Sequence, residues 1–330
     1  NAPYYVVVRA LSYILQENYL VTRLASVLLG LGVLIIFALL LRNWHDRKTT
    51  IIGTLLFGLS AWFLHTTRLG TPDVLWFVVF ALLACSFWLK RTNSWAALMA
   101  IFLLTAAALY IPGMIWFVGI GIIWQWKVID AIFKKHLLAV TLAGFLFLVS
   151  LIPLVGAMYK DQSLIKSWLG IPQDFPNLLE MIQNLLKAPF HLFVRGENNP
   201  TVWLGITPVL DIFALAMLVL GGYLYLTHVR LARTPLFLGI VLVTFGLMAL
   251  GSPISYTVII PILYLVIAAG VSYFLNQWFR VFPRNPIARG IGWGLISIVV
   301  ALAVGYHVTH YFVGWPQASA THEVFTLQQP

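Results

Sequence analysis

The chain has 330 residues, of which 61% are hydrophobic and 9% charged, and its mean hydropathy is +0.92. Soluble globular domains carry about 25% charged residues, so the composition excludes that class. It also excludes a nucleic-acid-binding protein despite the net charge of +10. A disulfide-stapled secreted domain is excluded because the only cysteine, Cys85, lies in an apolar run.

The apolar residues form runs of about 18 to 22, the length that a helix needs to cross the hydrocarbon core. These runs are continuous rather than alternating, which favours helices, because lipid requires that backbone hydrogen bonds be satisfied within each segment. We therefore predict an all-α, polytopic transmembrane helical bundle of about ten spans, with interfacial helices on its outer face. The spans are expected at residues 20–41, 50–65, 73–89, 95–110, 112–126, 137–157, 208–227, 235–251, 255–275 and 290–308.

The basic residues predict the orientation of the spans. One set of connections contains 13 of the 20 Lys and Arg but only two acidic residues, Asp46 and Asp130. The positive-inside rule assigns this set to the cytoplasm. The cytoplasmic connections are then residues 42–48, 90–91, 127–135, 230–233 and 280–289, and the outer segments are 1–19, 65–72, 158–207 and 309–330.

This order predicts five parts of the chain. They are an outer interfacial helix at 1–19, a core of six spans at 20–157, an outer loop with an amphipathic helix at 158–207, a four-span bundle at 208–308 and the start of an outer tail at 309–330. The chain begins at Asn1 on the outer side with no signal-peptide pattern. We therefore expect that a further span and part of an outer loop precede it in a longer protein.

The densest polar group is the segment 65–73, HTTRLGTPD. His65 and Arg68 end one span at i,i+3 spacing and Asp73 begins the next, so the three side chains can face one small volume. Charged groups near hydrocarbon are costly and need a reason to be there. A structural explanation stays open, in which Thr71 caps a helix, Asp73 favours its dipole, and Arg68 pairs with Asp73 or a lipid headgroup.

The long outer segment 158–207 carries the second candidate group. Five apolar residues recur on one side of a predicted helix, which is typical of a helix lying in the membrane interface. A polar turn with Arg195 and Glu197 follows this helix. Loops this long are usually functional or disordered, and the apolar stripe favours an ordered lid over a plain connector. The stripe consists of Leu178, Leu179, Ile182, Leu185 and Leu186.

Several segments, taken in order, resemble a known family. They are similar to motifs of the GT-C-type glycosyltransferases that use polyprenyl-phosphate sugars, including the dolichyl-phosphate-mannose protein mannosyltransferase-like and aminoarabinose-transferase-like enzymes. The family's first outer loop carries an acidic motif with the presumed catalytic base, and that loop would precede Asn1, so the chain as given is expected to lack the base and to be inactive by itself. The similar segments are 1–5, 22–26, 65–73, 110–113, 196–200, 208–211, 261–264 and 311–316.

The resemblance implies a membrane glycosyltransferase, expected in a bacterial plasma membrane with its active site outside. It would move a sugar from a polyprenyl-phosphate donor to an acceptor, which the chain does not identify, while lipid surrounds it. Arg68 and Asp73 are the expected catalytic residues: Arg68 would bind the phosphate through its bidentate fork. Asp73 would orient the acceptor, bind a divalent metal ion or hold Arg68, and no other cofactor is implied. The expected substrate-binding residues are His65, Arg195, Glu197 and Tyr110.

Two other classes stay open. A lipid or sugar transporter or flippase predicts polar residues at mid-membrane depth and often an inverted repeat, and the sequence shows neither. A non-catalytic membrane scaffold predicts that Arg68 and Asp73 tolerate substitution.

Overall fold

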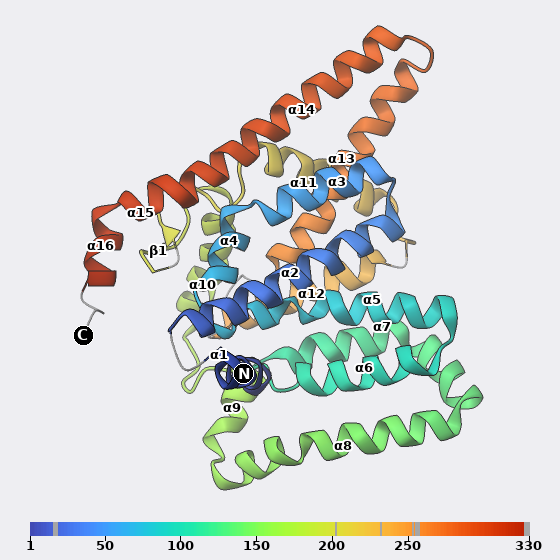
Figure 1. Cartoon of the computed structure of the whole chain (residues 1–330), viewed down its shortest axis with the longest axis vertical. Helices are drawn as coiled ribbons and strands as arrows, with labels where there is room; N and C mark the ends of the chain where they lie inside the picture. The colour runs from blue at the N-terminus through green and yellow to red at the C-terminus, as the bar shows by residue number, and fades with distance from the viewer. Residues whose placement is uncertain (16–18, 202, 232, 253, 255–257, 327–330) are drawn as a thin grey trace. The chain divides into compact units, whose positions relative to one another are not determined.

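The computed structural model describes residues 1–15, 19–201, 203–231, 233–252, 254 and 258–326, and these are almost entirely helical (Figure 1). The chain divides into two compact units. Unit 1 comprises Asn1–Ile36, Pro72–Leu185 and Ala232–Ile259, and unit 2 comprises Phe37–Thr71, Leu186–Leu231 and Ile260–Pro330. Two of the five divisions fall within helices, in α2 (Tyr19–Trp44) and in α10 (Leu178–Phe193).

Six helices are long and apolar enough to cross a membrane. They indicate an integral membrane protein, as the composition predicts. A seventh span results if α3 (Arg47–Gly58) and α4 (Ala61–Arg68), which are bent by 58° at their junction, count as one. The six are α2, η1 (Pro72–Phe77) continued by α5 (Val78–Thr92), α7 (Met114–Lys135), α8 (Leu137–Lys160), α13 (Ile260–Val281), and α14 (Pro286–Thr309) continued by η3 (His310–Gly314) and α15 (Trp315–Gln317).

The expected number of about ten spans is not confirmed, although each expected span overlaps at least one helix, and the span expected at 50–65 falls on two, α3 and α4. Three of those helices have only 14, 16 and 17 residues: α6 (Trp95–Ala108), α11 (Ile212–Thr227) and α12 (Arg233–Ala249). At 1.5 Å per residue they extend about 21 to 26 Å, less than the ~30 Å hydrocarbon core. The start of the span expected at 255–275 lies outside the described residues, as do 16–18 of the first expected part and 327–330 of the last.

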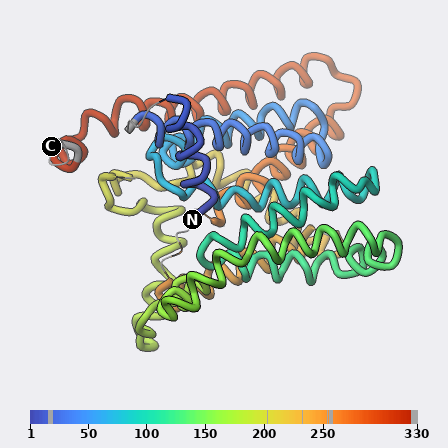
Figure 2. The backbone as a smooth tube through the Cα atoms, turned by 60° about the horizontal axis from the view of Figure 1, so that its bottom comes forward, coloured from blue at the N-terminus to red at the C-terminus, as the bar shows by residue number. Residues whose placement is uncertain are grey.

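In unit 1, helices α5, α6, α7 and α8 run side by side (Figure 2). The residues that form the core between α5, α6 and α8 are Leu89, Ala97, Leu98, Ala139 and Val140. Helix α1 (Ala2–Leu15) joins this unit through Tyr4, which is 1% exposed and whose hydroxyl donates to the carbonyl of Thr22 at 2.9 Å. A turn near Tyr110 is fixed to α9 (Ser163–Leu169), because the Gly113 N–H donates to the carbonyl of Trp168 at 2.7 Å.

In unit 2, α11 and α13 cross at very close range. A Cβ on Gly221 would lie 2.0 Å from the carbonyl oxygen of Val266, and one on Gly270 would lie 1.9 Å from that of Met217. Small residues allow helix backbones to approach in this way in membrane proteins. The ring of Phe57 on α3 packs against Tyr264 of α13 at 5.4 Å between centroids, which ties α3 to the same core.

Helix α10 shows the amphipathic pattern expected from its sequence. A capping box starts it, since the Asn177 N–H donates to the Glu180 carboxylate at 3.0 Å and the Glu180 N–H donates to the Asn177 side chain at 2.9 Å. All five residues of the predicted apolar stripe are exposed, between 40% and 74%. An exposed apolar stripe on a capped helix is what a helix lying in a membrane interface requires.

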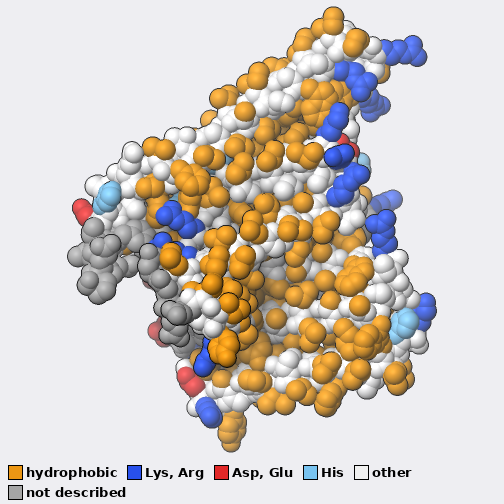
Figure 3. Space-filling model, viewed as in Figure 1, with side chains coloured by type: hydrophobic (Ala, Val, Ile, Leu, Met, Phe, Trp, Pro, Cys, Tyr) orange, Lys and Arg blue, Asp and Glu red, His pale blue; other side chains and the backbone are white. Residues whose placement is uncertain are grey.

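Many of the basic side chains visible in Figure 3 lie along the right-hand side of the view, and a few lie on the opposite side. In unit 2 those on the right-hand side surround the connection between α13 and α14, and in unit 1 they lie near the ends of α5 and α7. In the sequence these are the connections that the positive-inside rule assigns to the cytoplasm.

Candidate functional site

Arg68 is the last residue of α4 and is exposed, although the helix before it is buried. Ser60 caps the start of α4 by accepting from the Phe63 N–H at 3.3 Å. His65 is 1% exposed and Thr66 4%, so the helix is packed along its length up to its final residue. The guanidinium therefore emerges at the end of a fixed helix rather than from a loop.

The surface under Arg68 is built by the end of α14. The helix widens there into η3, a π-helical turn, and continues into α15. Such turns are rare and often occur at functional sites. This one brings Tyr311 (3% exposed) and Trp315 (7% exposed) into parallel alignment, with 2° between the ring planes and 6.3 Å between the centroids.

The guanidinium of Arg68 lies over both of these rings. Its central carbon is 5.6 Å from the Tyr311 centroid and 5.7 Å from the Trp315 centroid, within the range of cation–π attraction. One Nη also donates to the Tyr311 hydroxyl at 3.2 Å. No acidic side chain among the described residues forms an ion pair with Arg68. The result is an exposed cation that is held in place and not neutralised by an acid in the described chain.

Two histidines lie in the same aromatic cluster. The His65 ring is 4.7 Å from the Tyr311 centroid and 4.9 Å from the Trp315 centroid. The His310 ring is 4.6 Å from that of Trp203. The Nε2 atoms of both histidines are buried and find no hydrogen-bond partner among the described residues. Buried polar atoms in that state are uncommon and require an explanation.

The outer loop supplies the third wall of the cluster through a short hairpin. Strands β1 (Asn198–Asn199) and β2 (Trp203–Leu204) pair antiparallel, and Trp203 is fully buried. Its indole Nε1 donates to the carbonyl of Thr207 at 2.8 Å. Only glycine fits at position 196, because a Cβ there would lie 2.2 Å from the Trp203 ring. The Trp315 indole donates to the carbonyl of Pro200 at 2.9 Å, so the loop is fixed to the C-terminal segment.

Arg195 and Glu197 both belong to this loop. The Arg195 Nε donates to the carbonyl of Gly205 at 2.6 Å, and the side chain is otherwise exposed. Glu197 is half-buried. Unit 2 therefore contains four of the six residues predicted for the site: His65, Arg68, Arg195 and Glu197.

Asp73 and Tyr110 belong to unit 1. Asp73 is exposed in the first turn of η1, where a carboxylate favours the helix dipole. The Tyr110 hydroxyl donates to the carbonyl of Ser150 at 2.6 Å, and its own carbonyl accepts from the Asn1 amino group at 2.6 Å. The hydroxyl and the carbonyl of Tyr110 are thus both used in hydrogen bonds within unit 1. Among the described residues, no group of three His, Cys, Asp or Glu is placed to hold a metal ion.

A buried hydrogen bond that sequence reasoning misses lies beside the π-helical turn. The His307 Nε2 donates to Asp211 Oδ2 at 2.9 Å, and the two side chains are only 3% and 12% exposed. Asp211 also caps α11, because its Oδ1 accepts from the Ala214 N–H at 2.9 Å. The sequence indicates only this capping role. The sequence does contain one indication of this site: His307 and His310 stand at i,i+3 spacing near the end of a long apolar run.

Comparisons of the chain with protein-family models, with curated proteins and with solved structures find no match.

Proposed function

We propose that this protein is a membrane glycosyltransferase that moves a sugar from a polyprenyl-phosphate donor to an acceptor at the outer face of the membrane. The observation that carries the proposal is the Arg68 guanidinium, which is exposed, fixed over the rings of Tyr311 and Trp315, and not paired with an acid among the described residues. A guanidinium offers a planar fork that matches a phosphate. The apolar spans supply the surroundings that a lipid-linked donor requires.

In the proposed transfer reaction, Arg68 stabilises the charge on the leaving phosphate. An acceptor hydroxyl attacks the anomeric carbon of the sugar, the bond between that carbon and the phosphate oxygen breaks, and the phosphate leaves with an additional negative charge. A cation fixed beside the leaving oxygen stabilises that charge most in the transition state, because little reorganisation is needed. Arg195, which belongs to the same unit as Arg68, is proposed to provide a second contact to the phosphate. A base within hydrogen-bond reach must take the hydroxyl proton.

The buried rings under Arg68 support a binding role over a purely structural one. An arginine that serves only to stabilise the fold usually has a carboxylate or carbonyl partner, whereas Arg68 donates to a tyrosine hydroxyl, that of Tyr311, at 3.2 Å. The rings fix the orientation of the guanidinium without cancelling its charge. This arrangement leaves the other N–H groups available to an anion arriving from the membrane.

The test is transfer of a radiolabelled sugar from polyprenyl-phosphate donors by the complete protein in proteoliposomes, with mannose, glucose and aminoarabinose donors compared. We expect Arg68→Gln to lower kcat/KM about 10- to 100-fold, since hydrogen bonds to charged groups contribute about 1.5–3 kcal/mol. Arg68→Lys should retain part of the activity, because it keeps the charge and loses the fork.

Arg284→Gln is the matched control, because Arg284 is exposed in the connection between α13 and α14 and should leave transfer unchanged. Equal turnover of the Arg68→Gln and wild-type proteins would remove Arg68 from the site. Movement of the lipid across the bilayer without any sugar transfer would favour a flippase.

A further inference from the structure

A large apolar cavity lies within unit 1, between α5, α6, α7 and α12. Its volume is about 400 Å³, which is in the range of sites that take small molecules, about 300–1,000 Å³. Its walls are almost entirely apolar, and the polar side chains of Ser86 and Gln125 are hydrogen-bonded to one another. Ile122 and Phe133 line the cavity while being 44% and 46% exposed, so it opens to the surroundings of unit 1. Around a membrane protein those surroundings are lipid.

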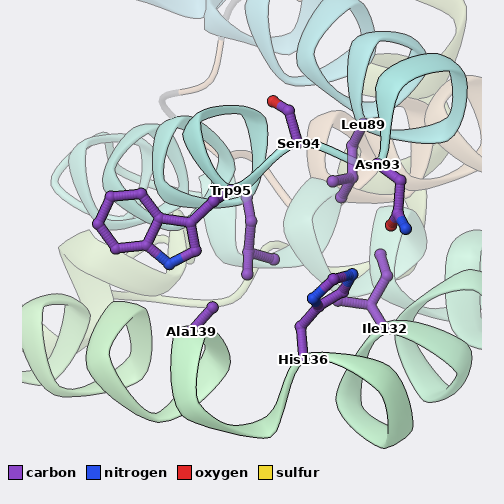
Figure 4. A pocket seen from close by; sticks show the side chains of 8 residues that line it. Leu89, Asn93, Ser94, Trp95, Ile132, His136 and Ala139 are labelled. Carbon is purple, nitrogen blue, oxygen red and sulfur yellow. The ribbon is translucent and has the colours of Figure 1, made fainter.

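One end of the cavity meets a small cleft that polar side chains line in part (Figure 4). The cleft and the cavity share Leu89, Leu98 and Ile132 as lining residues, so they are neighbours. In Figure 4, the side chains of Asn93 and His136 face each other across the gap between the α5–α6 and α7–α8 turns. The cleft measures only about 10 Å³, which is room for a single water-sized group. The His136 Nε2 is buried there and has no hydrogen-bond partner in the described part of the chain.

The same end of unit 1 is strongly basic. The Lys90 ammonium lies 5.0 Å from the ring centroid of Trp124, which lines the cavity, so a positive charge sits directly at its wall. Arg91, Lys134 and Lys135 are exposed beside the two turns. The nearby acid Asp130 is already paired with Lys134 at 2.7 Å. Juxtamembrane clusters of this kind attract anionic lipid headgroups.

We propose that unit 1 binds one anionic bilayer phospholipid. An acyl chain occupies the cavity, and the headgroup phosphate lies at the basic end, where Lys90 and Arg91 neutralise it and His136 contacts one of its oxygens. The three observations fit this occupant together. The cavity is apolar and open to lipid, it ends at a partly polar cleft with an unsatisfied imidazole nitrogen, and that end carries an excess of positive charge. The site is separate from Arg68, so its failure would leave the glycosyl-transfer proposal untouched.

The experiment measures retention of phosphatidylglycerol by the delipidated complete protein in native mass spectrometry. Phosphatidylcholine provides the zwitterionic comparison and a polyprenyl phosphate the competing lipid phosphate. We expect one phosphatidylglycerol to be retained per chain in preference to phosphatidylcholine. Lys90→Gln should weaken that binding about fivefold, since a basic residue near an anionic lipid surface contributes about 1 kcal/mol.

Two glycines of α7 give a matched pair of variants. Gly121 lines the cavity and a Cβ there meets nothing within 4 Å, so Gly121→Leu places a side chain in the open space and should abolish retention. Gly119 has equally open space but is not among the residues lining the cavity, so Gly119→Leu should bind as the wild type does.

Three results would overturn the proposal. They are equal retention of phosphatidylglycerol and phosphatidylcholine, unchanged retention in both Gly121→Leu and Lys90→Gln, and displacement of phosphatidylglycerol by an equimolar polyprenyl phosphate. The last result would assign the cavity to the sugar donor instead. Because Lys90 is exposed, its variant tests the site even where Gly121→Leu does not fold.

Discussion

His307 and Asp211 are 96 residues apart in sequence, yet their side chains form a buried hydrogen bond of 2.9 Å. The pair joins the end of α14 to the start of α11, directly before the π-helical turn that carries Tyr311. Hydrogen bonds to charged groups contribute about 1.5–3 kcal/mol, and removing one partner leaves the other polar group buried without that bond. We expect His307→Leu and Asp211→Asn both to lower the unfolding temperature clearly, as measured by thermal denaturation in detergent.

Asp211→Asn keeps a good helix cap, so the loss it causes belongs to the hydrogen bond with His307 and not to the cap. Asp46→Asn is the control, because Asp46 caps α3 by accepting from the Lys48 N–H at 3.2 Å and has no histidine partner in the described chain. A loss of stability in Asp46→Asn as large as that in Asp211→Asn would contradict the assignment.

The same pair predicts a dependence of stability on pH. Asp211 precedes α11 and lies outside the helices long enough to span the membrane. Burial raises the pKa of the Asp211 carboxyl. The hydrogen bonds from His307 and Ala214 together lower this pKa by more than burial raises it, so it lies below its ordinary value. A carboxyl whose pKa is depressed by folding stabilises the protein above its unfolded pKa, and this is lost as the pH falls through the folded pKa.

The unfolding temperatures of the wild type and Asp211→Asn should therefore differ most above pH ~4, near the ordinary pKa of aspartate, and converge at lower pH. The measurement is a series of thermal denaturations between neutral and acidic pH. A difference between the two proteins that grows on acidification would show the opposite sign and exclude the depressed pKa.

The sequence predicts the helical membrane class and the positions of the longer apolar helices, because long apolar runs determine both. The predicted number of about ten spans is not confirmed, because hydropathy does not distinguish helical residues from apolar residues in the turns. Residues 95–110 are apolar except for Thr105, yet α6 ends at Ala108 before the turn at Tyr110. Because the apolar run continues past Ala108, the sequence does not show that the helix ends there.

The candidate site can be predicted from the sequence only in part, because some of its residues come together through contacts between distant segments. His65 and Arg68 stand out because they are polar residues at the end of an apolar run. Trp203 and Trp315 do not stand out among thirteen tryptophans, which are expected at membrane interfaces in any case. Their role depends on contacts between segments more than a hundred residues apart, and a single sequence gives no signal for such contacts.

The crossing of α11 and α13 makes a sharp prediction about two adjacent glycines. A Cβ on Gly221 would lie 2.0 Å from a backbone oxygen of α13, and backbone cannot move aside as a flexible side chain can. Gly221→Ala should therefore destabilise the protein by about 1–3 kcal/mol, the usual cost of overpacking. Gly222→Ala meets nothing within 4 Å and should be neutral or slightly stabilising, because alanine favours the helix.

Thermal denaturation of the two variants side by side is the measurement. Gly221 and Gly222 are neighbours on one helix. Equal losses of stability in the two variants would therefore contradict a close crossing of α11 and α13.

The aromatic support of Arg68 predicts a graded effect on phosphate binding. Tyr311→Phe removes the 3.2 Å hydrogen bond but keeps the ring, whereas Tyr311→Leu removes both. Cation–π contacts at exposed sites contribute about 0.5–1 kcal/mol, so Tyr311→Leu should weaken binding of a polyprenyl phosphate about two- to tenfold and Tyr311→Phe less.

A double-mutant cycle tests whether Tyr311 affects phosphate binding through Arg68. If Tyr311 acts through Arg68, Tyr311→Leu should cause no further loss in the Arg68→Gln background. Additive losses would show that the ring contacts the ligand independently or supports the fold alone.

The exposed stripe on α10 predicts which side of that helix faces lipid. Leu186 belongs to the apolar stripe and Gln183 to the opposite, polar side, and both are exposed in the structure. Cys85 is the only cysteine, so a Cys85→Ser background allows single cysteines to be placed at either position. In proteoliposomes, a membrane-impermeant maleimide should label Gln183→Cys readily and Leu186→Cys slowly, because the apolar face of an interfacial helix is buried about 5–10 Å below the headgroups. Labelling after denaturation gives the total for each variant, and equal rates at the two positions in the bilayer would place α10 in water instead.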